Sequence, residues 1–197
     1  MKIAVDLDDT INHYIEHMLT FFEKKHGKHN LTKENFIHRH LHQCLGITKE
    51  KFDVFFDQFQ MDEFMREMKP HPEAKEVLPI LALDHEFYII TGRLKPHTWE
   101  VEDWLSKHFP GIFKKVFIAK NPYFPDNDHL KTKEEYCKEI GVSLFIDDDP
   151  NFALHVANEG FKVLMIENPW NKSVVHDNII HVKDWHDIAK HINHGKR

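Results

Sequence analysis

The feature that most constrains the fold of this chain is an alternation between short apolar runs and longer segments with helical spacing. Five apolar runs have the composition of buried strands, at residues 3–5, 87–90, 115–119, 144–146 and 161–166. Each run ends in polar residues, and segments with helical signals separate the later runs. Strands and helices that alternate in this way form β–α–β units with parallel strands. The sequence therefore predicts an α/β fold with a mostly parallel sheet flanked by helices.

Helix signals mark the segments between the later strands. One helix is expected to begin at Pro96. A second begins after Thr132, which can form a capping box with Glu135. A third is expected over residues 150–159, with Asp149 as its capping residue.

The stretch between the first and second predicted strands has a different character. Over residues 11–72 no strand-like run occurs, and apolar residues recur at helical spacing. These residues fall into two groups, Ile15, Met18, Leu19 and Phe22 in the first and Phe52, Phe55, Phe56 and Phe59 in the second. We therefore expect a helical cap at residues 13–72, inserted into a Rossmann-like core made of residues 1–12 and 73–197.

Composition narrows the range of functions. The chain has 197 residues, 41% of them hydrophobic, and a formal net charge of −6. A core can form, but a broad basic face for duplex nucleic acid is not expected. The longest apolar stretch, residues 77–83, is too short and contains a proline, so a membrane span is not expected.

The chain ends and the cysteines suggest a cytoplasmic protein. Met1 and Lys2 lead directly into the first predicted strand, which leaves no room for a signal peptide. Cys44 and Cys137 lie far apart in sequence, so neither a disulfide scaffold nor a zinc ribbon is expected. No sequence feature predicts the oligomeric state.

Chemically capable side chains follow three of the predicted strands. Asp6 and Asp8 follow the first, Thr91 follows the second, and Asp147 and Asp148 follow the fourth. Ligands of open α/β sheets bind beyond the carboxyl ends of the strands. Carboxylates at that edge could hold Mg²⁺, and a hydroxyl with a lysine ammonium could bind phosphate oxygens. The pattern indicates chemistry on a phosphorylated small molecule.

These residues also carry a resemblance to a known family. The sequence Asp-Leu-Asp-Asp-Thr at residues 6–10 resembles the first motif of the haloacid dehalogenase-like (HAD) hydrolases. Thr91 is similar to their second motif, Lys133 to their third, and Asp147 with Asp148 to their fourth. The four motifs occur in the order of that family. The Ile-Asp-Asp-Asp-Pro form of the last motif and the helical insertion resemble bacterial nucleotidases and 5′(3′)-deoxyribonucleotidases.

The resemblance implies a role for each acidic residue. Asp6 would be the nucleophile that forms an aspartyl-phosphate, and Asp8 would protonate the leaving alkoxide and then deprotonate the hydrolytic water. Mg²⁺ would lie between Asp6, the backbone carbonyl of Asp8, and Asp147. Asp148 would orient the metal's waters or Lys133.

Thr91, Gly92 and Lys133 are expected to bind the substrate phosphate. An acid at position 8 favours a Mg²⁺-dependent phosphomonoesterase over a dehalogenase, because a leaving alkoxide needs a proton. Aromatic residues of the cap favour a nucleotide as the substrate, with sugar phosphates or other small metabolites as the alternative. A phospho-acceptor signalling domain and a non-catalytic binding module remain alternatives from other functional classes.

Several residues near the motifs have two interpretations. Arg93 could bind phosphate or form an exposed structural ion pair. Either Lys131 or Lys133 could be the lysine that binds the phosphate, and Lys133 is favoured. Trp170 could line the site or simply pack. The residues His38, His40 and His42 are interpreted as solvated surface in preference to a metal site. Possible substrate contacts at the start of the cap are Asn12, His13 and Tyr14.

Overall fold

A computed structural model describes residues 1–197 except 39, 62, 94–97, 123–128 and 195–197. Its centre is a six-stranded sheet with the order β3-β2-β1-β4-β5-β6, in which all neighbouring strands are parallel. The strands are β1 (Lys2–Val5), β2 (Glu86–Thr91), β3 (Phe113–Ile118), β4 (Leu144–Asp147), β5 (Lys162–Ile166) and β6 (Ile179–Val182). The predicted α/β fold with a parallel sheet is therefore confirmed.

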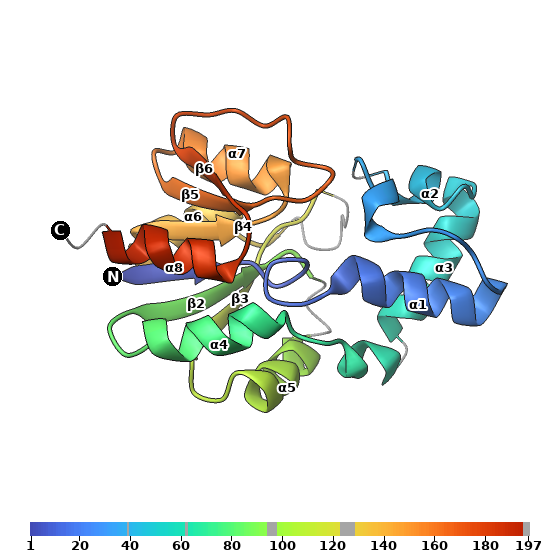
Figure 1. Ribbon diagram of the computed structural model, residues 1–197, viewed down its shortest axis with the longest axis horizontal. Coiled ribbons are helices and arrows are strands. Elements are labelled where there is room, and N and C mark those ends of the chain that lie inside the picture. Colours follow the sequence, from blue (N-terminus) through green and yellow to red (C-terminus); the bar gives the residue numbers. More distant parts are fainter. Residues whose placement is uncertain (39, 62, 94–97, 123–128, 195–197) are drawn as a thin grey trace.

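Helices cover both faces of the sheet (Figure 1). One face packs against α4 (Pro72–Leu81), α5 (Thr98–His108) and α8 (Trp185–His194). The other face packs against α6 (Lys133–Ile140) and α7 (Pro150–Asn158). Because both faces are covered, the central strands β1, β4 and β5 are almost continuously apolar, which explains why they stand out in the sequence.

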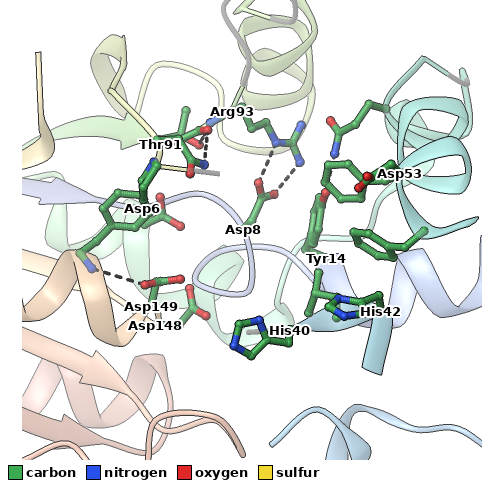
Figure 2. Close-up of a pocket in the computed structure, with 18 of the residues that line it drawn as sticks. Asp6, Asp8, Tyr14, His40, His42, Asp53, Thr91, Arg93, Asp148 and Asp149 are labelled. Atoms are coloured by element: carbon green, nitrogen blue, oxygen red, sulfur yellow. Dashed lines mark hydrogen bonds and ion pairs between the residues drawn. The ribbon is translucent and has the colours of Figure 1, made fainter. Parts of the chain in front are cut away.

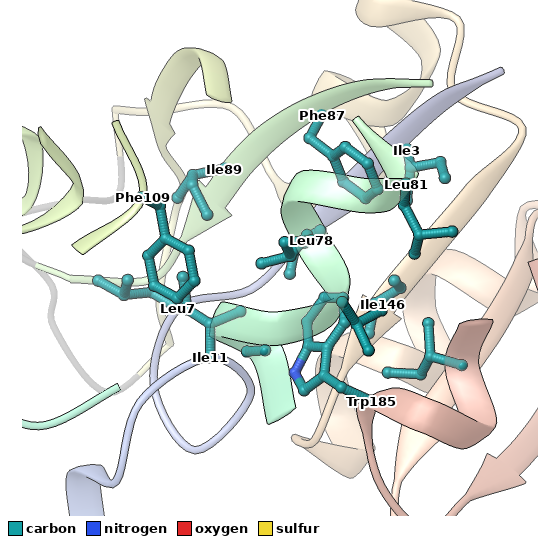
Figure 3. Packing of buried hydrophobic residues seen from close by; sticks show 14 of the residues in the cluster. Ile3, Leu7, Ile11, Leu78, Leu81, Phe87, Ile89, Phe109, Ile146 and Trp185 are labelled. Carbon is teal, nitrogen blue, oxygen red and sulfur yellow. The ribbon is translucent and has the colours of Figure 1, made fainter. Parts of the chain in front are cut away.

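The hydrophobic cluster on the first face ties the two ends of the chain together. Figure 3 shows Ile3 of β1, Leu78 of α4 and Trp185 of α8 within this cluster. The Trp185 indole N–H also donates a 2.8 Å hydrogen bond to the backbone oxygen of Thr10. Helix α8 thus supports the loop that follows β1.

The predicted helix starts agree with the structure wherever they can be compared. The Thr132 hydroxyl caps α6 and forms the capping box with Glu135. The carboxylate of Asp149 accepts hydrogen bonds from the backbone N–H groups of Asn151 and Phe152 at the start of α7. The predicted start at Pro96 lies outside the described residues.

The sequence analysis missed the last strand and the helix after it. Strand β6 has only four residues and lies at the sheet edge, where it pairs with β5 alone. Ile179 is buried, but Ile180 is exposed to water, so the segment lacks a continuous apolar run. Short edge strands carry a weaker sequence signal than central strands of a parallel sheet.

The segment between β1 and α4 forms a group of helices beside the carboxyl edge of the sheet (Figure 1). Its elements are α1 (Tyr14–His26), α2 (Leu41–Cys44), α3 (Lys49–Met61) and the 3₁₀ turns at Lys33–Asn35 and Glu63–Glu67. Residues 27–32 have no regular structure, so the prediction of helix throughout this region is wrong there. The helices share their own hydrophobic cluster, and among the described buried residues of this cluster only Trp170 comes from the core part of the chain. This supports the proposed division into a cap and a core.

The two segments that connect this helical group to the sheet, around residues 11–13 and 69–71, lie side by side. The His13 N–H donates to the backbone oxygen of Lys69 at 3.1 Å, and the His71 N–H donates to that of Ile11 at 2.9 Å. The entering and leaving segments are therefore hydrogen-bonded to each other. None of the described helices combines the length and the hydrophobicity that crossing a bilayer requires.

We predict that Phe59→Ala destabilises the protein by about 3–5 kcal/mol, because it leaves a cavity in the core of the helical group. The Phe59 side chain is fully buried, and its ring centroid lies 5.5 Å from that of Tyr14 and 5.4 Å from that of Phe21. Urea unfolding followed by circular dichroism measures the loss. The control is Val54→Ala on the exposed side of the same helix, which should change stability by less than about 0.5 kcal/mol. Equal effects of the two substitutions would contradict the assignment of this core.

Candidate active site

The carboxyl ends of three neighbouring strands meet at one point of the sheet edge. Strand β1 lies between β2 and β4, with Val5 opposite both Ile89 and Ile146. The next residue, Asp6, donates its N–H to the backbone oxygen of Ile146 at 2.9 Å. Thr91 ends β2 and Asp147 ends β4. The topology thus brings together residues that are far apart in sequence.

A cavity of about 420 Å³ opens between this edge and the helical cap (Figure 2). The core side is lined by Asp6, Asp8, Thr91, Gly92, Arg93, Asn121, Pro122, Asp148, Asp149 and Phe152. The cap side is lined by Tyr14, His40, Leu41, His42, Lys49, Phe52, Asp53, Phe56 and Gln60. Its two walls have different chemistry, since the core wall holds the acidic motifs and the cap wall is largely aromatic.

Of Lys131 and Lys133, it is Lys133 that contacts the acidic motifs. Its ammonium lies 2.6 Å from Oδ1 of Asp6 and 2.8 Å from Oδ2 of Asp147, and the side chain is 1% exposed. Lys131 is exposed and pairs with Glu139 at 2.6 Å instead. The geometry therefore favours Lys133 over Lys131 as the lysine of the site, because Lys133 begins helix α6 and lies against the ends of β1 and β4.

Negative charge is concentrated below the cavity. Carboxylate oxygens of Asp6, Asp147 and Asp148 all lie within 4.8 Å of one another, and all three residues are buried. Burial raises the pKa of Asp6, and Asp147 and Asp8 raise it further, although Lys133 opposes them. Burial likewise raises the pKa of Asp147 against the effect of Lys133. Three hard oxygen donors crowded at this depth fit a divalent cation such as Mg²⁺.

Asp147 is occupied by protein groups. Its Oδ2 accepts from Lys133, and its Oδ1 accepts the backbone N–H of Asp149 at 2.8 Å. The residue has no exposed surface and does not line the cavity.

Asp148, by contrast, lines the cavity. Its carboxylate is oriented by the Thr10 hydroxyl and the Trp170 indole N–H, each at 3.1 Å. Asp148 is therefore the aspartate of this pair that faces the cavity, whereas the sequence analysis expected Asp147 as the metal ligand and Asp148 behind it. Trp170 is a packed aromatic of the cap cluster, and it contacts Asp148 without being among the described residues that line the cavity.

Arg93 forms a buried ion pair with Asp8. The guanidinium donates from Nε to Oδ2 at 2.8 Å and from Nη2 to Oδ1 at 2.5 Å (Figure 2). The arginine side chain is only 8% exposed, so the expected exposed ion pair is corrected to a buried one. Asn12 donates to the same carboxylate at 3.0 Å. The sequence could not identify this pair because its partners are 85 residues apart.

Gly92 allows a close approach of two loops. A Cβ atom at this position would lie 2.8 Å from Nδ2 of Asn121, which donates to the Gly92 carbonyl at 2.7 Å. A larger residue would therefore displace Asn121, a cavity residue that the sequence analysis did not select. The neighbouring Thr91 hydroxyl oxygen accepts the backbone N–H of Arg93 at 3.3 Å.

The histidines of the cap agree in part with the interpretation made from sequence. His40 is exposed to solvent and His42 is half-buried, and both also line the cavity, whereas the ring of His38 contacts the sulfur of Cys44. Among the described residues, the acidic cluster is the group with metal-binding spacing, and the histidines do not form one. Of the three expected cap contacts, Tyr14 lines the cavity, whereas Asn12 reaches Asp8 and His13 does not line it.

Comparison with known proteins places the chain in a family. A profile of the family described as "5′ nucleotidase, deoxy (Pyrimidine), cytosolic type C protein" matches residues 1–197. The chain belongs to this family. A nucleotidase of Clostridium acetobutylicum is 23% identical over 192 residues, which cover 95% of this chain and 91% of that protein. The chain is thus an enzyme of the HAD-like phosphatase and nucleotidase group, and that resemblance is confirmed.

Solved structures support the fold. A haloacid dehalogenase-like hydrolase from Streptococcus pneumoniae superposes with a TM-score of 0.67 at 14% identity, covering 97% of each chain. The HAD-hydrolase YfnB of Bacillus subtilis, solved bound to magnesium, superposes with a TM-score of 0.60 at 14% identity, covering 98% of each chain. At these identities the likeness concerns the fold.

We predict that Mg²⁺ binds more weakly as the pH is lowered. Because the pKa of Asp6 is raised, lowering the pH adds a proton that the cation must displace. The apparent affinity should fall by up to about tenfold per pH unit for each proton released. Calorimetric titration with MgCl₂ at several pH values measures this dependence. Asp6→Asn should bind Mg²⁺ weakly and with less pH dependence, and an affinity that is independent of pH in the wild type would contradict the prediction.

Proposed function

We propose that this enzyme hydrolyses phosphomonoesters with Mg²⁺ as its cofactor and with Asp6 as its nucleophile. The observation that carries the proposal is the position of the Asp6 carboxylate, which lines the cavity while Lys133 holds one of its oxygens at 2.6 Å. This contact orients the carboxylate and offsets charge near the incoming phosphate.

The chain's own residues provide a site for the cation. Asp6, Asp148 and the backbone carbonyl of Asp8 would hold Mg²⁺, with Asp147 retaining Lys133. When bound, the ion offsets the repulsion between a carboxylate nucleophile and a phosphate dianion. The related fold of the magnesium-bound YfnB supports this choice of metal.

The proposed reaction has two steps. An Asp6 oxygen attacks phosphorus, the bond from phosphorus to the leaving oxygen breaks, and that oxygen takes a proton from Asp8. A water molecule then attacks the phosphorus of the aspartyl-phosphate and gives a proton to Asp8. The bond from phosphorus to Asp6 breaks, which restores the carboxylate and releases inorganic phosphate.

Thr91 and Gly92 are the proposed contacts of the transferring phosphate. Both line the cavity next to Asp6, and the close approach of Asn121 fixes the carbonyl of Gly92. Lys133 remains a predicted phosphate contact, reached from its position against Asp6.

A nucleotide fits the cavity better than a sugar phosphate does. The cap wall presents the half-buried rings of Phe52 and Phe56, stacked with centroids 5.2 Å apart and an interplanar angle of 27°. Flat apolar rings favour a nucleobase, which stacks through its π-face. The family description and the nucleotidase relative point to the same substrate class.

Asp6→Asn should abolish turnover, with kcat reduced by at least about a thousandfold. It should also abolish the covalent intermediate. Rapid acid quenching with ³²P-labelled nucleotide is expected to leave label on the wild type, released by hydroxylamine as an acyl phosphate would be. Asp57→Asn, on an exposed part of α3, is the matched control and should keep full activity. Turnover that survives Asp6→Asn, or that is insensitive to EDTA, would contradict the mechanism.

Phe56→Leu should raise the KM for a nucleoside 5′-monophosphate, because it removes a stacking partner worth about 1–3 kcal/mol. That loss corresponds to about 5- to 150-fold in KM. A sugar phosphate, which has no aromatic group, should be affected much less, and the two substrates are compared by steady-state kinetics. A wild-type preference for sugar phosphates, or equal effects on both substrates, would favour the alternative substrate class.

A further inference from the structure

Arg93 lies at the junction between the sheet and the cap. It follows β2 in the chain, and its guanidinium is buried against Asp8 with two hydrogen bonds. A planar guanidinium that binds both oxygens of a carboxylate fixes the direction of that carboxylate. The Asp8 side chain is 22% exposed and borders the cavity, and Asn12 donates to only one of its two oxygens, so the paired guanidinium hydrogen bonds add the main restraint on its rotation.

The cap surrounds the same guanidinium. The Cζ atom of Arg93 lies 5.7 Å from the ring centroid of Tyr14, and Nη2 lies 3.9 Å from the sulfur of Met68. Tyr14 is itself held by Gln60, whose Nε2 donates to its hydroxyl. Two parts of the insertion therefore contact Arg93, the start of α1 and the segment that returns to the core, and the end of α3 supports the first of them through Gln60.

The return segment is anchored in the core as well. The Trp104 indole N–H of α5 donates to the backbone oxygen of Met68 at 2.7 Å. Because Met68 is tied to α5 and Tyr14 belongs to α1, a movement of the cap relative to the sheet would change the contact of Tyr14 with Arg93, whereas Met68 stays with the core. Arg93 contacts both the cap and Asp8, so a change in the position of the cap can alter the orientation of the Asp8 carboxylate through Arg93.

We propose that Arg93 is a positioning residue that aligns Asp8 for proton transfer, and that Tyr14 of the cap holds Arg93 in this position. The inference rests on the proposed role of Asp8 in exchanging protons with the leaving group and the water. The inference also gives Arg93 a role other than phosphate binding, because the Nε and Nη2 edge of its guanidinium faces Asp8. A misalignment of about 1 Å at a reacting group can lower a rate by about a hundredfold.

The test compares two substrates of nearly equal shape, phenyl phosphate and 4-nitrophenyl phosphate. Phenolate is the poorer leaving group and needs the proton from Asp8, whereas 4-nitrophenolate leaves as a stable anion. The value of kcat/KM covers the steps through the loss of this group. We expect Arg93→Gln to lower the ratio of kcat/KM for phenyl phosphate to that for 4-nitrophenyl phosphate by about tenfold or more.

Companion variants separate positioning from a structural role. Arg93→Lys keeps the charge but loses the planar fork, so its ratio should fall between those of the wild type and Arg93→Gln. Tyr14→Leu removes the ring beside the guanidinium and should lower the ratio in the same direction. Melting temperatures show that the variants are folded, and a general loss of structure would lower both kcat/KM values equally.

The outcomes distinguish this inference from the function on which it rests. Asp8→Asn should lower the same ratio; if it does not, the proton-transfer role of Asp8 is wrong and the inference falls with it. If Asp8→Asn lowers the ratio but Arg93→Gln and Arg93→Lys leave it unchanged, only the inference is overturned. A higher inhibition constant for inorganic phosphate in Arg93→Gln, with an unchanged ratio, would show that Arg93 binds the phosphate instead.

Discussion

The contact on which the site depends is the buried ammonium of Lys133 between two carboxylates. Asp6 comes from β1, Asp147 from β4, and Lys133 from the start of α6, so one side chain joins three elements. Removing a charge from water is costly unless it is paired, and here each buried partner depends on the others. A third carboxylate, that of Asp148, lies in the same cluster. The fold therefore holds an excess of negative charge at the sheet edge, which is what a cation-assisted reaction on phosphate requires.

The helical insertion completes the cavity without adding to the acidic cluster. The sheet brings the carboxylates together, whereas the insertion lines the opposite wall of the cavity with aromatic rings and histidines. The two parts meet through backbone hydrogen bonds between the connecting segments and through the guanidinium of Arg93. In the proposed function, the sheet would therefore carry the chemistry and the insertion would contact the part of the substrate that leaves.

Much of the sheet and of the acidic site could be predicted because the signals are local. Asp6 and Asp8 directly follow an apolar run, and the Thr132 capping box predicts the start of the helix that carries Lys133. The remainder depends on contacts between distant residues. The pairing of Arg93 with Asp8 has no local signature, and neither does the fact that Asp148 lines the cavity while Asp147 does not, since tertiary contacts decide which side chain faces the cavity. Strand β6 was missed for another reason, because a half-exposed edge strand lacks a long apolar run.

The hydrogen bond from Trp185 to Thr10 joins segments that are 175 residues apart in the sequence, which has a consequence for the order of events during synthesis. Helix α8 follows all six strands of the sheet in the chain, so a ribosome makes every strand before it makes this support. The loop after β1 must therefore wait for α8 to dock before its backbone is braced. A polypeptide that stops before α8 would form the strands but lack the support behind the loop that carries Asp6 and Asp8.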